Sequence, residues 1–192
     1  MSLVEMERYE EALPELQRAL QVSGSDTATR LLTGKALHKL GRGDEALGYL
    51  ESCFSAPREG LMALALAARL YRETGRTARA VDAFQEYWDR GGREPAQVLE
   101  WARACRDAGE PERMVPTFEY MAAAGSLTTA MLTHWADAFE KQQQPDKALR
   151  CLVTVIEHTP ADPRAYFNCA DLMFRLEAYT DAAGVYQQGL RF

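Results

Sequence analysis

The feature that most constrains this chain is a 34-residue period that continues along the sequence without a gap. One column of this period is small, and a large apolar column follows it four residues later. The small column contains Ala12, Ala46, Ala80, Ala148 and Ala182, with Met114 in the remaining slot. The large column contains Leu16, Leu50, Phe84, Phe118, Leu152 and Tyr186. A fixed period of this length predicts stacked copies of one supersecondary unit, each burying its apolar face on its neighbours.

A second pair of columns lies earlier in each unit, and its large residues follow the small ones by three positions. The small column contains Gly34, Ala68, Ala102, Ala136 and Ala170, and the large one Leu37, Tyr71, Cys105, Phe139 and Met173. Spacings of three and four place residues on one helical face, and small residues let antiparallel helices approach closely. Each unit is therefore predicted to contain two helices.

Glycine and proline mark the expected ends of these helices. Gly41, Gly75 and Gly109 stand where the first helix must stop. Pro111 and Pro145 stand where the second helix starts, a position that tolerates the missing N–H. Pro14 and Pro116 share a slot inside the second helix of their units. We expect each of these two to delay or kink its helix, because an interior proline costs ~3 kcal/mol.

The columns and the glycines and prolines at the expected helix ends together resemble the tetratricopeptide repeat family over essentially the whole chain. The resemblance implies an all-α fold, a right-handed α-solenoid of about eleven antiparallel helices. The expected layout is a single array over 1–192, divided into a partial repeat at 1–26 and repeats at 27–60, 61–94, 95–128, 129–162 and 163–192. The partial repeat would contain only the end of a first helix, from Leu3 to Met6, and a second helix. Met114 and Pro116 make the 95–128 repeat the expected weak point.

The last repeat ends without a polar capping helix, so Val185, Tyr186 and Leu190 would be left uncovered. We therefore expect the chain to be a fragment of a longer protein, or to self-associate through its uncapped ends.

Composition excludes several classes of function. The net charge of −6 disfavours nucleic-acid binding, which needs a basic surface. No apolar stretch is long enough to insert into a membrane, and no signal peptide is present, so a cytoplasmic protein is expected. Cys53, Cys105, Cys151 and Cys169 match no zinc module, and burial of the thiols is favoured over redox or metal roles. The sequence contains no catalytic or nucleotide-binding motif, so we expect no enzyme activity, no metal and no cofactor.

The face of each first helix that points away from the packing columns is the expected site, because first helices line the concave groove in tetratricopeptide repeat arrays. The groove residues are Leu31, Lys35, His38, Arg69, Arg72, Leu99, Arg103, Arg106, Asp137, Glu140 and Asp171. Their basic members form a stripe over three repeats, and the acidic members follow it. Such a groove would accept a peptide or protein segment with an acidic part, because arginine binds carboxylates through two parallel hydrogen bonds.

An alternative explains the same charges without a ligand. Four of them are followed by an opposite charge four residues later, which indicates ordinary surface pairs worth ~0.2–0.5 kcal/mol each. The four pairs are Arg69 with Glu73, Arg103 with Asp107, Asp137 with Lys141 and Asp171 with Arg175.

One tetratricopeptide repeat subclass clamps the C-terminal carboxylate of chaperone peptides with Asn and Lys side chains. The matching slots in this sequence contain Leu31 with Lys35, then Leu66 and Met62. The required set is incomplete, and Asn168 alone does not restore it, so chaperone-tail binding is not expected.

Two function classes remain open from the sequence. The first is a non-catalytic scaffold that binds a protein or peptide segment in its concave groove. The second is an accessory region of a larger enzyme or of a secretion or assembly machine, whose active domain lies outside these residues.

Overall fold

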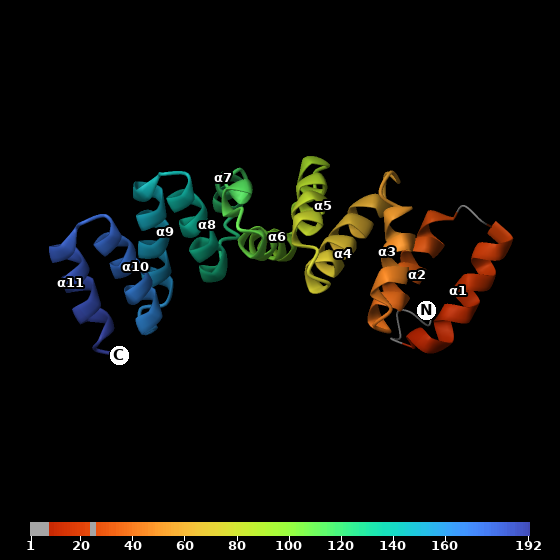
Figure 1. The fold of residues 1–192 in the computed structure, drawn as a ribbon, viewed down its shortest axis with the longest axis horizontal. Coiled ribbons are helices and arrows are strands. Elements are labelled where there is room, and N and C mark those ends of the chain that lie inside the picture. Colours follow the sequence, from red (N-terminus) through yellow and green to blue (C-terminus); the bar gives the residue numbers. More distant parts are fainter. Residues whose placement is uncertain (1–7, 24–25) are drawn as a thin grey trace. The chain divides into compact units, whose positions relative to one another are not determined.

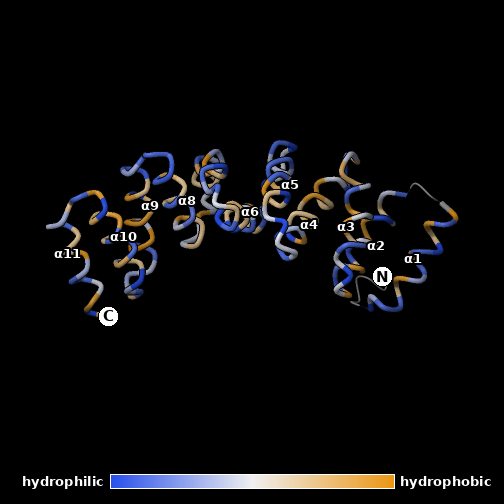
Figure 2. The backbone as a smooth tube through the Cα atoms, in the orientation of Figure 1, coloured by the Kyte–Doolittle hydropathy of each residue, from blue (hydrophilic) through white to orange (hydrophobic). Residues whose placement is uncertain are grey.

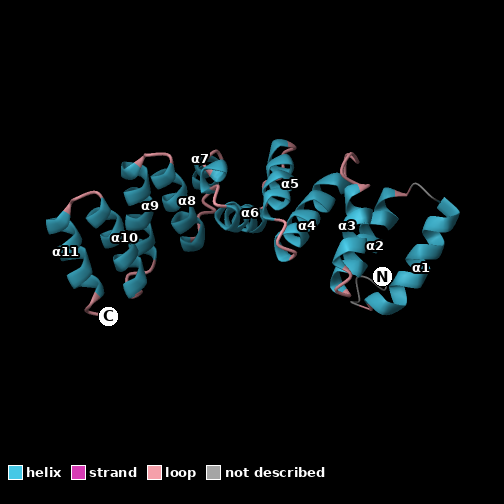
Figure 3. Cartoon of the chain, in the orientation of Figure 1, coloured by secondary structure: helices cyan, strands magenta, loops and turns pink. Residues whose placement is uncertain are grey.

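The computed structural model describes residues 8–23 and 26–192, and all regular structure in these residues is helical (Figures 1 and 3). The prediction of an all-α chain with about eleven helices is confirmed. The helices of the described residues are α1 (Tyr9–Ser23), α2 (Thr27–Lys39), α3 (Gly43–Glu51), α4 (Glu59–Glu73), α5 (Thr77–Asp89), α6 (Pro95–Ala108), the 3-10 helix η1 (Pro111–Met114), α7 (Thr117–Ala123), α8 (Thr129–Lys141), α9 (Pro145–His158), α10 (Pro163–Arg175) and α11 (Tyr179–Gly189).

Successive helices pack as pairs: α2 with α3, α4 with α5, α8 with α9 and α10 with α11. By its contacts the chain forms two compact units, a first that ends at Gln97 and a second that runs from Val98 to Phe192. Each unit is described below by itself. The repeat boundaries and the single array therefore stay predictions, and the expected helix at Leu3–Met6 lies outside the described residues.

The turn inside each pair has one backbone conformation, repeated every 34 residues. Gly41, Gly75 and Gly109 have φ values of 75°, 74° and 76°, as expected for glycines that end a helix. Gln143 and Glu177 occupy the next two slots and adopt the same left-handed conformation, with φ of 58° and 64°. In all five turns the following N–H donates to the carbonyl five residues earlier, for example Gln144 N to Phe139 O at 2.9 Å. The period thus fixes the turn even where the residue is not glycine.

The core follows the four columns of the sequence. Gly34 faces Leu50, so closely that a Cβ at Gly34 would lie 2.8 Å from the Leu50 Cγ. Leu37, Ala46 and Leu50 of the same helix pair are fully buried. Figure 2 shows hydrophobic residues recurring along the helices of both units. The four cysteines are buried and unbridged, which agrees with the packing role expected for them.

The two prolines predicted to disturb their helices behave differently. Pro14 lies inside α1, which continues from Tyr9 to Ser23, so the predicted delay of the helix is wrong there and the kink stays a prediction. Pro14 is exposed, and an exposed helical carbonyl that loses its N–H partner can be satisfied by water. At Pro116 the prediction is confirmed, because the expected second helix is divided into η1 and α7. Around the division the hydrogen bonds join residues three apart, from Val115 N to Glu112 O and from Phe118 N to Val115 O.

Leu190, directly after the final helix α11, is 75% exposed, whereas Val185 and Tyr186 within that helix are half-buried. The uncapped end stays a prediction. No helix among the described residues is both long and apolar enough to cross a membrane.

Candidate functional site

In the first unit the predicted groove residues come from α2 and α4. Lys35 is exposed, and His38 and Arg69 are half-buried. His38 Nε2 lies 2.9 Å from Glu73 Oε2, so the side chains of the two first helices meet directly. This contact joins one predicted groove residue, His38, to the C-terminal end of α4.

A cavity of about 430 Å³ opens beside Arg69. Met62 and Leu66 of α4 give it an apolar wall, and Met62 is 65% exposed. The Arg69 Nε is buried and has no hydrogen-bond acceptor among the described residues. A buried donor without a partner costs free energy, so this cavity favours an oxygen acceptor next to an apolar group.

The far wall of this cavity comes from the residues that follow α5. Arg93 lies over the Trp88 ring, with its guanidinium carbon 3.7 Å from the ring centroid, and Arg93 Nη1 donates to Gly92 O at 2.8 Å. Trp88 is half-buried. Stacking and hydrogen bonding hold the Arg93 guanidinium in place. Of these two arginines, Arg69 is the one with a buried donor that lacks an acceptor within the described residues.

In the second unit the predicted residues come from α6, α8 and α10, and four of them line two neighbouring cavities. Arg106, Asp137 and Glu140 line the first, of about 430 Å³. Asp137 and Glu140 also line the second, of about 280 Å³, together with Asp171. The change from basic to acidic residues predicted from the sequence thus falls at one place in this unit.

Two of the acidic residues that line these cavities accept hydrogen bonds from side chains on the next helix. Glu140 accepts two hydrogen bonds from Arg175, at 2.9 and 2.8 Å, which raises the pKa of Arg175. Tyr186 of α11 donates to Asp171. Asp137 is exposed at the residue level, yet loss of solvent around its carboxyl group, and secondly the charge of Glu140, raise its pKa above the ordinary value. Asp137 therefore takes up a proton at a higher pH than an ordinary aspartate does.

The surface ion pairs expected within single helices are wrong in partner. Glu73 pairs with His38 rather than Arg69, and Arg103 donates to Glu100 at 2.6 Å rather than to Asp107. Lys141 donates to Gly109 O at 3.0 Å, and Arg175 binds Glu140 rather than Asp171. Three of these four contacts link neighbouring helices, because the side chains of adjacent helices approach as closely as those one turn away.

The sequence reasoning missed a further column of the groove. Leu66, Glu100, His134 and Asn168 are 34 residues apart, and Leu66 and Asn168 line cavities described above. His134 is 8% exposed, and burial, then the charges of Arg106 and Arg103, lower its pKa to about 4. The exact period was the signal that could have revealed this column.

Comparison with known families decides the assignment. Three family models described as tetratricopeptide repeat match residues 3–59, 63–90 and 134–192. The chain belongs to the tetratricopeptide repeat family. The resemblance noted in the sequence is thereby confirmed in three separate stretches, while no curated protein matches the whole sequence.

Solved tetratricopeptide repeat structures have the same fold. YrrB, described as a TPR protein with an unusual peptide-binding site, aligns with a TM-score of 0.76 at 14% identity, over 92% of this chain and 91% of its own. MamA aligns with a TM-score of 0.73 at 14% identity, over 88% and 92%. A tetratricopeptide repeat protein from Parabacteroides merdae gives 0.66 at 17% identity, over 98% and 75%. At these identities the likeness establishes the fold alone.

Proposed function

We propose that the chain is a non-catalytic interaction scaffold that binds a protein or peptide segment along the groove residues of its first helices. The observation that carries this proposal is the meeting of charge and apolar surface in the cavities beside Arg69 and Arg106. Among the described residues, no group of His, Cys, Asp and Glu could hold a metal ion. Recognition by shape and charge is therefore the chemistry that these surfaces support best.

The chemistry of the two units suggests what the segment contains. The buried Arg69 donor next to Met62 and Leu66 suits a carboxylate that adjoins an apolar side chain. Asp137 and Glu140 suit a basic or amide group further along the segment. We infer a partner segment with an acidic and apolar part for the first unit, and with a basic or amide group for the second.

The relative with the highest TM-score given above lends support of a general kind. YrrB is described as having a peptide-binding site. A related fold can therefore present such a site, and the position of the site in the present chain rests on the residues named above.

Charge reversal tests the proposal. A partner is first captured with the chain and identified by mass spectrometry, and its binding is then measured with purified components. The double variant Arg69→Glu and Arg106→Glu should weaken binding at least about tenfold, since two charge-assisted contacts would become repulsive. Circular dichroism should show unchanged helicity.

The matched control reverses two exposed arginines elsewhere, Arg18→Glu in α1 and Arg191→Glu after the end of α11. It changes the net charge by the same amount and should leave affinity unchanged. Equal loss of affinity in both double variants would mean that only net charge matters, and it would contradict a specific groove. Added salt should weaken wild-type binding, because exposed charges are screened.

A further inference from the structure

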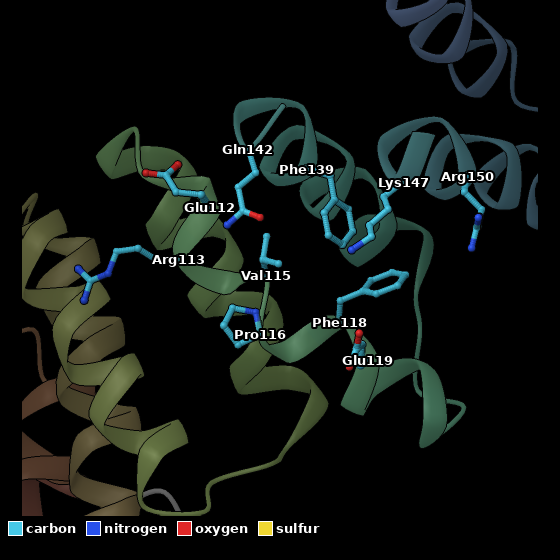
Figure 4. Close-up of a pocket in the computed structure, with 10 residues that line it drawn as sticks. All are labelled: Glu112, Arg113, Val115, Pro116, Phe118, Glu119, Phe139, Gln142, Lys147 and Arg150. Carbon is cyan, nitrogen blue, oxygen red and sulfur yellow. The ribbon is translucent and has the colours of Figure 1, made fainter. Parts of the chain in front are cut away.

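A third cavity lies in the Val98–Phe192 unit, and it is lined by other residues than the groove cavities. It encloses about 480 Å³ and is lined by η1, α7, the end of α8 and α9 (Figure 4). This volume is within the range of pockets that bind ligands or side chains. None of the predicted groove residues lines this cavity.

The cavity exists because the second helix of this pair is interrupted at Pro116. Helix α7 starts only at Thr117. Trp135 of α8 donates hydrogen bonds to the interrupted segment. The Trp135 indole N–H lies 3.3 Å from Met114 O and 3.1 Å from Thr117 Oγ1. These contacts fix the interrupted segment against α8, so the cavity is a built feature of the fold.

The floor of the cavity is apolar and aromatic. Phe118 packs edge-on against Phe139 with their ring centroids 5.1 Å apart, and Val115 and Pro116 extend this surface. Figure 4 shows Val115, Pro116 and the two rings around the same hollow. Phe118 is half-buried, which leaves part of an aromatic ring open to an incoming apolar group.

One wall of the cavity is basic. Lys147 and Arg150 are exposed and lie three residues apart on α9, hence on one helical face. Lys147 Nζ lies 5.4 Å from the Phe139 ring centroid, and Figure 4 shows its amine directed to that ring. Among the described residues neither cation has a carboxylate partner within ion-pair distance. The acidic residues of the rim, Glu112 and Glu119, come from η1 and α7 instead.

We propose that this cavity is a second binding site, which accepts a large apolar side chain of a protein segment with a carboxylate on the neighbouring residue. The apolar side chain packs on Phe118, Phe139 and Val115, and the carboxylate binds Lys147 and Arg150. An apolar floor beside two cations that lack a carboxylate partner in the described part of the chain complements this pair of groups. The site is separate from the proposed groove and does not depend on it.

The test uses the full isotope-labelled chain and three peptides with blocked ends, in which glycine and serine flank a central pair of residues. The first contains a central Phe-Glu pair, the second a Phe-Lys pair and the third an Ala-Glu pair. Only the Phe-Glu peptide should shift the amide resonances of Phe118, Phe139 and Lys147 in a saturable way. The Arg150→Glu variant should weaken this binding at least about tenfold, and the matched Arg191→Glu variant should not.

Two outcomes would overturn the proposal. One is equal binding of the three peptides. The other is a set of shifts confined to Arg106, Asp137 and Glu140, which would assign the peptide to the groove and leave the cavity unused. Because Arg150 and Arg191 are both exposed, their variants should fold, and an unchanged amide spectrum outside the cavity checks that they do.

Discussion

His134 is a residue whose protonation depends strongly on its surroundings. Its pKa is lowered from 6.5 to about 4, first by burial and then by Arg106 and Arg103. Between pH 6.5 and 4 the unfolded chain binds the proton more readily than the folded chain, so acid in this window destabilises the fold. The sequence could not predict this, since the burial and the two arginines come from the packing of α6 on α8.

We therefore expect the free energy of unfolding to fall by up to about 3 kcal/mol more in the wild type than in His134→Gln as the pH falls from 7 to 4. Urea unfolding at several pH values measures this difference. A midpoint near 6.5 in the NMR titration of His134 would contradict the account.

Gly34 shows why the small columns are small. Its place opposite Leu50 could be predicted from the period alone, because columns repeated at exact spacing describe one helical interface. Gly34→Ala should destabilise the chain by about 1–3 kcal/mol, since the added Cβ would lie 2.8 Å from two Leu50 carbons.

The matched control is Gly48→Ala in the same helix pair. An added Cβ there has no atom within 4 Å, so the change should stabilise helix α3 by about 0.5–1 kcal/mol. Denaturant midpoints of both variants test the packing account. Equal effects of the same sign would show that helix propensity, and not contact with Leu50, decides.

At the level of helices, the turns show which features could be predicted from the sequence and which could not. Three of the five left-handed positions are glycines and were predicted. Gln143 and Glu177 carry no such signal, and only the period shows that they share the slot. The two interior prolines look alike in sequence, yet only Pro116 divides its helix. Buried Met114 and the Trp135 hydrogen bonds favour that division, and they belong to the tertiary structure.

Gln143→Gly should stabilise the chain by about 1 kcal/mol, because a non-glycine residue at positive φ is strained. Gln142→Gly, one position earlier at φ −79°, should instead destabilise it, since glycine gains nothing at a negative φ and loses more entropy on folding. Thermal or urea unfolding measures both variants. A loss of stability in Gln143→Gly would refute the assigned turn.

At the scale of the whole molecule, the order of the helices followed from the period, and the family assignment agrees with it. A continuous groove does not follow from the period, because the groove residues divide between two compact units. Arg106, Asp137, Glu140 and Asp171 line two cavities of the second unit, and Arg69 lines a cavity of the first. The charges alone could not predict their partners, which lie mostly on neighbouring helices.

Stability should vary along the chain. Helix α7 has seven residues and follows an interruption, whereas α9 has fourteen. We expect the amides of α7 to exchange with solvent faster than those of the neighbouring helices α6, α8 and α9, because a short helix has few interior hydrogen bonds. Native-state hydrogen exchange measures this order. Protection of α7 equal to that of α9 would show that the interruption does not weaken this part of the chain.

The most direct test of the proposed function is photo-crosslinking to the captured partner. A photoreactive amino acid is placed at the exposed groove positions Lys35 and Arg106, and for comparison at the exposed positions Gln17 and Gln187 on α1 and α11. The account predicts partner adducts from the two groove positions and none from the other two. Adducts from Gln17 and Gln187 alone would contradict binding along the first helices.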